Sequence, residues 1–183
     1  MAAARGESGR KEKDKRRKVL IVDLEETLVS GNELVDDALK FLEKVRKEYV
    51  VVLLSNYTES RIKEILSRHI LYPYLDLVVS ATDYDMRKPD PRIIGVIRSL
   101  LYDKFDRKFD LRNFWIVGDR PDRDIVLGNL AGIKTIRVRR GKYADRDAEF
   151  DEEKPKYEVS SLTEAAEILL LSRKRGAKKT RKR

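Results

Sequence analysis

The chain has 183 residues, of which 41% are hydrophobic and 40% charged, and it contains no cysteine. This length suits one domain with appendages, and the apolar content can close a core, which excludes a fully disordered chain. The missing cysteines exclude a disulfide framework, a cysteine-ligated zinc site and thiol catalysis. Because no apolar run approaches roughly 18 residues and the N-terminus resembles no secretory signal, we expect a soluble, cytoplasmic protein without a membrane partner.

The net charge of +9 is unevenly distributed along the chain. Residues 1–18 carry +5 and residues 172–183 carry +8, whereas residues 19–171 carry −4. The chain is therefore a mildly acidic body with two basic tails. The absence of Cys and Gln together with abundant charged side chains is typical of proteins from thermophiles.

Continuous apolar runs alternate with stretches of helical spacing over residues 18–171. In chain order these patterns predict a strand at 18–23, a helix at 35–48, a strand at 49–54, a helix from Thr58 through Leu66 and a strand at 75–80. They then predict a helix from Pro91 through Leu101, a strand at 113–117, a helix at 122–131, strands at 133–138 and 157–159, and a helix opened by the capping box Ser161 and Glu164.

Repeated strand–helix units predict an α/β fold, a Rossmann-like, doubly wound parallel sheet with helices on both faces. The continuous apolar character of the strands supports this, since strands of such sheets are buried on both sides. We expect three parts: a basic disordered N-terminal arm at 1–17, the α/β domain at 18–171 and a basic C-terminal tail at 172–183.

Polar side chains follow four of the predicted strands, and ligands of such sheets bind beyond the carboxyl ends of the strands. These side chains are Asp23, then Ser55 and Asn56, then Lys88, and finally Asp119 with Asp124. Gaps of 32, 33 and 31 residues between Asp23, Ser55, Lys88 and Asp119 each match one strand–helix unit, so the groups should converge. Carboxylates can hold Mg²⁺ or attack phosphorus, and a lysine and a hydroxyl can bind phosphate oxygens. The set indicates phosphoryl transfer, although one such Asp by itself often only caps a helix.

With these motifs the chain resembles the haloacid dehalogenase (HAD) superfamily, whose members are mostly Mg²⁺-dependent phosphatases. The resemblance covers about residues 18–171 and depends on DLEET at 23–27, SN at 55–56, the Lys88 of RKPDP and GDRPDRD at 118–124. It implies a HAD-like fold, an Mg²⁺ cofactor, a phosphorylated substrate and hydrolysis of a phosphomonoester through an aspartyl-phosphate.

The resemblance also assigns roles to individual residues. They are catalytic Asp23, Glu25 and Lys88; substrate-binding Thr27, Ser55 and Asn56; and metal-binding Asp23, Glu25, Asp119 and Asp124. Asp23 would be the nucleophile, and Lys88 would stabilise the charge of the nucleophile and the phosphate. Glu25 would bind the metal through its main-chain carbonyl, and Asp124 would support the metal or Lys88.

Glu25 departs from the family pattern, which usually has Asp two residues after the nucleophile to protonate the leaving group and then activate water. Glutamate keeps the carboxylic acid, but its extra methylene shifts that group by roughly 1 Å, and such a misplacement can cost about 10²-fold in rate. Three interpretations stay open. The loop has shifted to accommodate an active acid/base, dephosphorylation is slow, or the fold serves binding only.

The intervals between the first three motifs leave no room for the cap domains of the family, so we expect an open site, which by resemblance suits large substrates such as nucleic acid ends. The tails 1–18 and 172–183 are either solvated, solubilising segments or polyanion-binding arms with salt-dependent affinity. We favour binding because both ends are basic while the body is acidic. The alternative function is therefore a weak or inactive HAD-fold protein that binds RNA, a ribosome or DNA.

Overall fold

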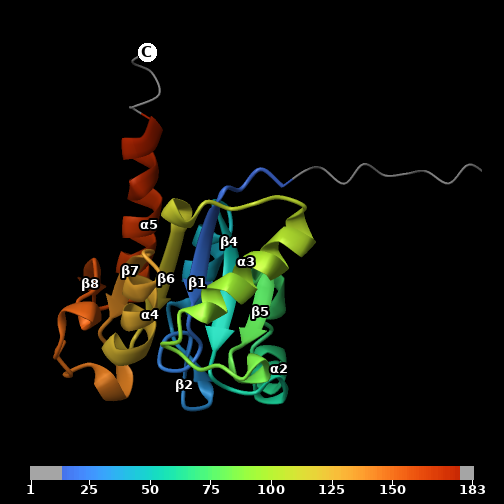
Figure 1. Ribbon diagram of the computed structural model, residues 1–183. Helices are drawn as coiled ribbons and strands as arrows, with labels where there is room; N and C mark the ends of the chain where they lie inside the picture. Colours follow the sequence, from blue (N-terminus) through green and yellow to red (C-terminus); the bar gives the residue numbers. More distant parts are fainter. Residues whose placement is uncertain (1–13, 178–183) are drawn as a thin grey trace, which may run out of the picture.

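The centre of the molecule is a six-stranded parallel sheet (Figure 1). The computed structural model describes residues 14–177. The strands are β1 (Lys18–Val22), β4 (Tyr49–Ser55), β5 (Leu77–Ser80), β6 (Phe114–Gly118), β7 (Lys134–Val138) and β8 (Tyr157–Val159). Their order in the sheet is β5-β4-β1-β6-β7-β8, and every neighbouring pair is parallel, which confirms the predicted sheet.

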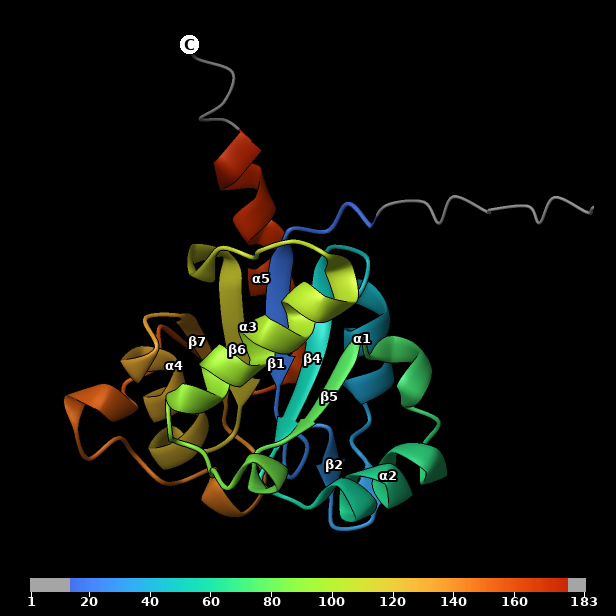
Figure 2. The ribbon, with the colours of Figure 1, turned by 45° about the vertical axis from the view of Figure 1, so that its right-hand side comes forward.

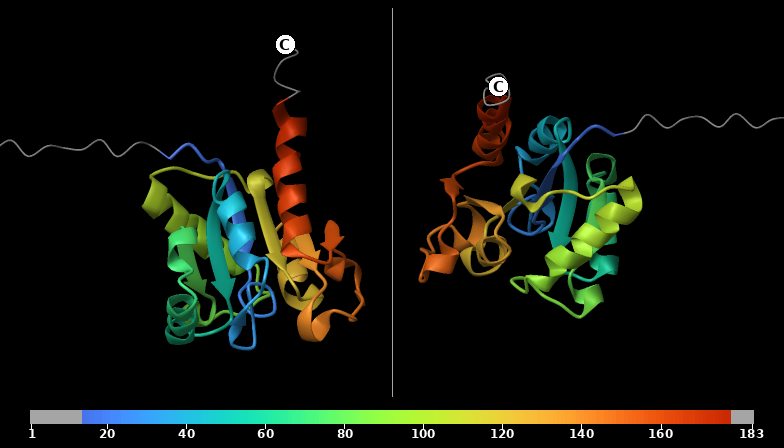
Figure 3. Two further views of the ribbon diagram at one scale, coloured as in Figure 1. Left: turned by 180° about the vertical axis from the view of Figure 1, so that it is seen from behind. Right: turned by 45° about the horizontal axis from the view of Figure 1, so that its top comes forward.

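Helices cover both faces of this sheet, as predicted. They are α1 (Ala38–Val45), α2 (Glu59–Arg68), α3 (Arg92–Phe105), α4 (Val126–Leu130) and α5 (Leu162–Ala177). Figure 2 shows α3 crossing one face, which it shares with α4, and Figure 3 shows α1 and α5 on the opposite face, which they share with α2. Short 3₁₀ turns occur at η1 (Tyr72–Tyr74), η2 (Thr82–Tyr84), η3 (Leu111–Asn113), η5 (Gly141–Tyr143) and η6 (Asp151–Glu153), and a π-helical turn at η4 (Pro121–Ile125).

The sheet has a separate hydrophobic core on each face because successive side chains of a strand point to opposite sides. In β1, Val19 and Ile21 belong to the core with α3 and α4, whereas Leu20 and Val22 belong to the core with α1, α2 and α5. The seven residues of β4 are all buried. Because apolar side chains occupy the middle of each strand on both faces of the sheet, polar side chains can come together at the ends of the strands.

A small hairpin after β1 was not predicted. It consists of β2 (Val29–Ser30) and β3 (Glu33–Leu34), and the turn between them includes Gly31 at a φ of 61°. Residues 33–34 are thus taken into a strand, and α1 begins at Ala38 rather than at residue 35. The short hairpin lacks the alternating apolar pattern of a longer strand, which is why its sequence gave no signal.

Described structure extends beyond the predicted α/β domain, residues 18–171, at both ends. Residues 14–17, assigned to a disordered arm, are held by Arg16, whose guanidinium donates to the carbonyl of Tyr49 at 2.8 Å and pairs with Asp76 at 2.7 Å. Helix α5 continues to Ala177, beyond the predicted end at 171. Charge density alone does not reveal such partners. The rest of the predicted tails, residues 1–13 and 178–183, lies outside the described residues.

No helix of the described part is long and apolar enough to cross a membrane.

Candidate active site

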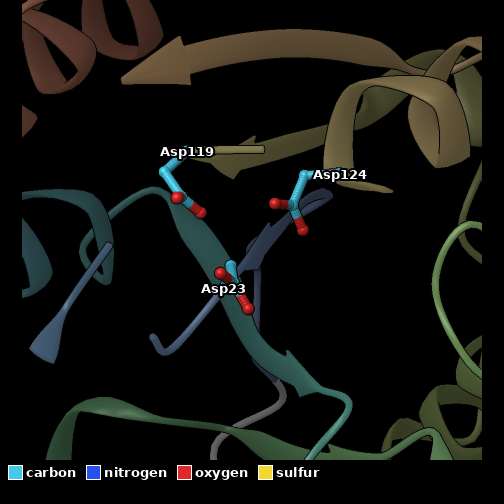
Figure 4. A group of neighbouring side chains, drawn as sticks. All are labelled: Asp23, Asp119 and Asp124. Carbon is cyan, nitrogen blue, oxygen red and sulfur yellow. The ribbon is translucent and has the colours of Figure 1, made fainter. Parts of the chain in front are cut away.

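Three aspartates meet at the carboxyl ends of β1 and β6 (Figure 4). Asp23 directly follows β1 and Asp119 directly follows β6, and the amide of Asp23 donates to the carbonyl of Val117 at 3.0 Å, which ties the two ends together. Asp124 lies in the turn η4. All three residues are buried, and one carboxylate oxygen of each lies within 4.8 Å of the others. The structure therefore brings together the carboxylates that the strand spacing predicted to converge.

Lys88 completes this cluster from the loop after β5. Its Nζ donates to Asp23 Oδ1 at 2.5 Å, to Asp124 Oδ1 at 2.6 Å and to the carbonyl of Leu54 at 3.2 Å. Burial by itself lowers the pKa of Lys88, but the charges of Asp124 and Asp23 outweigh burial and raise the pKa above its ordinary value. Lys88 therefore carries a positive charge and fixes the orientation of the Asp23 carboxylate.

Asp119, unlike Asp23 and Asp124, receives no hydrogen bond from Lys88. Both of its carboxylate oxygens are buried, and neither has a hydrogen-bond partner among the described residues. Burial, followed by the charges of Asp124 and Asp23, raises the pKa of Asp119 to about 8. Three carboxylates facing one ammonium leave excess buried negative charge, which a divalent cation with oxygen ligands would balance. The donor set thus fits Mg²⁺, with these three aspartates to hold it.

Gly118 allows η4 to pack tightly against the end of β6. A Cβ at this position would lie 2.3 Å from Asp124 Cγ, which is too short for a contact between two carbon atoms. The Asp124 amide donates to the carbonyl of Arg120 at 3.0 Å, and the Arg120 amide donates back to Asp124 Oδ2 at 3.3 Å. Asp122 in the same turn pairs instead with the Arg120 side chain at 2.5 Å. The motif GDRPDRD therefore positions Asp124 and keeps Asp122 outside the aspartate cluster.

The three predicted substrate-binding residues occupy different surroundings. Ser55 at the end of β4 is buried beside the cluster and lines the pocket above it. Asn56 also lines the pocket, but its side chain accepts from the amide of Lys88 at 2.7 Å and donates to the Lys88 carbonyl at 3.4 Å. Asn56 thus fixes the backbone that carries the lysine. Thr27 is fully buried and its hydroxyl donates to Asp23 Oδ2 at 3.5 Å, so it supports the loop that carries Asp23.

Glu25 is exposed at the wall of the same pocket. Its carboxylate is hydrogen-bonded to the hydroxyl of Tyr57, and burial together with this carboxylate raises the pKa of Tyr57 to about 12. Tyr57 therefore keeps its proton at neutral pH and stays a donor to Glu25. No sequence pattern predicts this contact, because it joins two loops that are 32 residues apart.

The cluster forms the floor of an open pocket of about 300 Å³. Its lining residues are Asp23, Glu25, Glu26, Ser55, Asn56, Tyr57, Arg87, Lys88, Asp119, Arg120, Arg123, Asp124, Lys142 and Tyr143. The floor carries most of the acidic groups, whereas four of the remaining wall residues are cationic. The pocket therefore offers both a metal-binding carboxylate cluster and positive charge for an anionic ligand.

Arg137 on β7 fixes one wall of this pocket, and sequence reasoning missed it. The side chain is buried, and its guanidinium donates to the carbonyls of Asp119 at 3.3 Å, of Tyr143 at 2.8 Å and of Arg146. It also pairs with Glu158 at 3.2 Å. An arginine within an apolar strand gives no hint of these partners, because they come from three other segments.

We expect Mg²⁺ to raise the melting temperature of the protein and the variant Asp119→Asn to abolish this effect. Saturation with a ligand at about 100 times its Kd stabilises by roughly 2.7 kcal/mol, which is a shift of roughly 5–10 °C for a chain of this size. Without metal and at about pH 9, above the pKa of Asp119, Asp119→Asn should melt above the native protein because it removes an unpaired buried charge. Thermal denaturation with Mg²⁺ or a chelator measures both effects. The control Asp122→Asn alters an aspartate already paired with Arg120 and should keep the Mg²⁺ shift; an unresponsive native protein would contradict metal binding.

Comparison with known proteins agrees with this fold and site. Residues 85–165 match the HAD-hydrolase-like family model. Over 107 residues the chain is 32% identical to a glyceraldehyde 3-phosphate phosphatase of Methanopyrus kandleri, covering 58% of this chain and 43% of the relative. A protein of the same name from Methanocaldococcus jannaschii is 29% identical over 113 residues, covering 58% and 42%. The chain thus matches less than half the length of these relatives.

Solved structures extend the likeness to most of the fold. A magnesium-bound crystal form of YfnB from Bacillus subtilis aligns with a TM-score of 0.65 at 22% identity, over 76% of this chain and 57% of that chain. An uncharacterised protein from Listeria monocytogenes aligns with a TM-score of 0.70 at 24% identity, over 86% and 99%. Together with the sequence matches, these results show that the chain has the α/β fold of HAD hydrolases and that residues 85–165 match their family model.

Proposed function

We propose that this protein is a Mg²⁺-dependent phosphomonoester hydrolase that works through an aspartyl-phosphate on Asp23. The observation that carries this proposal is the pairing of Asp23 with Lys88 at 2.5 Å beside an Asp119 whose oxygens have no partner among the described residues. The phosphatase names of the two archaeal relatives support it.

Asp23 supplies the nucleophile. Lys88 holds Oδ1, and Oδ2 has only a 3.5 Å contact with Thr27, so this second oxygen is the less engaged one. It attacks phosphorus in line, and the bond from phosphorus to the leaving oxygen breaks as the bond to Asp23 forms. Mg²⁺, when bound, would neutralise charge on the phosphoryl oxygens. Lys88 balances the remaining charge, and Ser55 lies where its hydroxyl can donate to the phosphoryl group.

Glu25 acts as the acid and then as the base. It protonates the leaving oxygen, and afterwards it takes a proton from the water that attacks phosphorus and releases Asp23 and inorganic phosphate. Its place on the pocket wall supports this role, as does Tyr57, which restrains the longer side chain by a hydrogen bond. Of the three open interpretations of Glu25, we adopt the accommodated acid/base.

We infer that substrate reaches this site without a cap domain. The interval from β1 to β4 holds the hairpin and α1, and the interval from β4 to β5 holds α2 and η1. A large or nucleic-acid substrate stays a prediction. The alternative of nucleic-acid binding through the tails 1–18 and 172–183 depends largely on residues 1–13 and 178–183, outside the described part, and stays a prediction.

Hydrolysis of p-nitrophenyl phosphate tests the proposed activity. We expect turnover with Mg²⁺, loss of turnover with a chelator and recovery when Mg²⁺ is restored, because the aspartate cluster needs a cation to accept a phosphate. A folded protein that is silent under all three conditions, with this substrate and with alkyl phosphates, would contradict a phosphatase.

The same assay separates the interpretations of Glu25. For Glu25→Gln we expect a rate loss of about 10²–10⁴-fold with alkyl phosphates, whose leaving oxygen needs a proton. The loss should be smaller with p-nitrophenyl phosphate, because nitrophenolate leaves without protonation. Equal losses for both substrates would assign Glu25 to water activation alone, and no loss would remove it from the mechanism.

A further inference from the structure

Three cationic side chains at the mouth of the pocket have no assigned role. Arg87 directly precedes Lys88 after β5, Arg123 lies in η4 after β6, and Lys142 lies in η5 after β7. They come from three separate connections of the sheet and yet line the same opening. Arg87 and Lys142 are exposed and Arg123 is half-buried, so all three can meet a ligand.

These cations lack acidic partners, which distinguishes them from Arg120 in the same pocket. Arg120 on the same wall pairs with Asp122 at 2.5 Å, and Arg146 pairs with Asp122 at 2.8 Å. In the part of the chain that the structure describes, none of the three mouth cations has a carboxylate within ion-pair distance. A solvated charged surface would scatter such residues among acids, whereas here three unpaired cations gather at one opening.

The backbone that carries these cations is fixed before any ligand arrives. Asn56 holds the backbone of Lys88, the neighbour of Arg87, at 2.7 Å. The carbonyl of Arg120 accepts from the amide of Arg123 at 3.4 Å. Arg137 holds the carbonyl of Tyr143, the neighbour of Lys142, at 2.8 Å. The three side chains therefore project from anchored segments, which limits the entropy lost when they bind a ligand.

We propose that Arg87, Arg123 and Lys142 bind a second anionic group of the substrate, so that the protein acts on small phosphomonoesters that also carry a carboxylate or another phosphate. This proposal rests on the proposed function, since the first phosphate occupies the floor beside Asp23 and Lys88. Guanidinium groups bind carboxylates and phosphates through paired N–H donors, and an ammonium adds a point charge. A pocket of about 300 Å³ suits a small ligand of this kind.

Two glutamates also line the pocket, and the Glu26 side chain lies against Gly141, the residue before Lys142. Glu25 is hydrogen-bonded to Tyr57, and Glu26 accepts from Ser30 at 2.9 Å; among the described residues neither glutamate forms an ion pair with a mouth cation. An anion is repelled by these two glutamates and attracted to the three cations. Glyceraldehyde 3-phosphate, which the names of the archaeal relatives specify, has an aldehyde and would leave the cations unpaired. We therefore expect a substrate preference different from the one those names specify.

Two matched compounds test the proposal. 3-Phosphoglycerate and glyceraldehyde 3-phosphate share a carbon skeleton and differ in a carboxylate against an aldehyde. We expect kcat/KM of the native protein to favour 3-phosphoglycerate by about tenfold or more, since each exposed charge pair contributes about 0.2–1 kcal/mol. The preference should shrink at high salt, which screens exposed charges. Equal kcat/KM values would overturn the proposal.

Variants assign the preference to the mouth. The triple variant Arg87→Ala, Arg123→Ala and Lys142→Ala should reduce the ratio of the two kcat/KM values to about one, with single variants reducing it about 2–5-fold each. Arg98→Ala removes an equally exposed arginine from α3, outside the pocket, and should keep the native ratio. A triple variant that keeps the native ratio would contradict the assignment.

Calorimetry separates this proposal from the proposed function. The variant Asp23→Asn with Mg²⁺ should bind 3-phosphoglycerate more tightly than glyceraldehyde 3-phosphate, and the mouth variants in that background should lose the difference. This readout needs no turnover, so it holds even if p-nitrophenyl phosphate is not hydrolysed. Tighter binding of a 5′-phosphorylated oligonucleotide than of 3-phosphoglycerate would overturn the small-molecule assignment and favour a nucleic-acid end.

Discussion

Replacing Asp23 by Asn should abolish turnover while leaving the fold intact. The amide oxygen of Asn can still accept from Lys88 Nζ, so the buried lysine keeps a neutral partner and its ion pair with Asp124 at 2.6 Å. The amide cannot form an acyl phosphate, however, and loss of a nucleophile costs on the order of 10⁴–10⁶-fold in kcat in enzymes whose catalytic groups act as a unit. The rate of phosphate release with Mg²⁺ measures the loss directly.

Chemical trapping shows whether Asp23 itself carries the phosphoryl group. Acid quenching of the native protein during turnover of a ³²P-labelled substrate should leave the label on the peptide that contains Asp23. Asp36→Asn, which alters an exposed aspartate outside the pocket, is the matched control and should retain full activity and labelling. If Asp23→Asn keeps more than a small fraction of the native rate, water attacks phosphorus directly and the covalent route is wrong.

Replacing Lys88 by Met should strongly destabilise the metal-free protein at neutral pH. The methionine leaves Asp23 and Asp124 buried and facing each other without their shared cation. Breaking a buried ion pair by removing one partner costs about 3–5 kcal/mol, which lowers the melting temperature by roughly 10 °C in a chain of this size. Thermal denaturation in the presence of a chelator measures this loss without interference from bound metal.

The loss should depend on pH in a definite direction. Burial, followed by the charge of Asp23, already raises the pKa of Asp124 to about 6 in the native protein, against the opposing charge of Lys88. An acid whose pKa is higher in the folded than in the unfolded state destabilises the fold at high pH, and this penalty fades as pH falls through the folded pKa. The gap between native and Lys88→Met should therefore be wider at about pH 8 than at about pH 5.

A double variant separates charge from packing. Lys88→Met combined with Asp124→Asn removes one of the two facing carboxylates and should recover much of the stability lost in the single variant. If the double variant is no more stable than Lys88→Met at about pH 8, the defect comes from lost packing and not from unpaired charge.

The sequence predicts the sheet and its aspartates well because both depend on repeating patterns. Buried strands of a parallel sheet are apolar throughout, and one strand–helix unit has a nearly constant length. Strands such as β4 can therefore be located from composition, and residues such as Asp23 and Asp119 can be assigned to one edge of the sheet from their spacing. The six strands and their parallel arrangement are confirmed, with ends shifted by one or two residues.

The contacts that finish the pocket could not be predicted because each depends on one pair of distant side chains. No repeating sequence pattern indicates the hydrogen bond from Tyr57 to Glu25. The same is true of the hydrogen bond by which Asn56 fixes the backbone of Lys88. Arg16 shows the same limit, since a residue within a basic run proved to have its own acidic partner in Asp76. Local patterns predict the elements, and long-range pairs fix the loops.

Arg137 has a consequence for the speed of ligand exchange. It joins the carbonyl of Asp119 to those of Tyr143 and Arg146, so this wall of the pocket cannot swing outward without leaving buried N–H groups unpaired, at about 1–3 kcal/mol for each. This wall of the pocket is therefore rigid and does not open and close. For the proposed activity we therefore expect ligand entry and phosphate release to be governed by diffusion and electrostatic attraction, without a slow conformational change before each cycle.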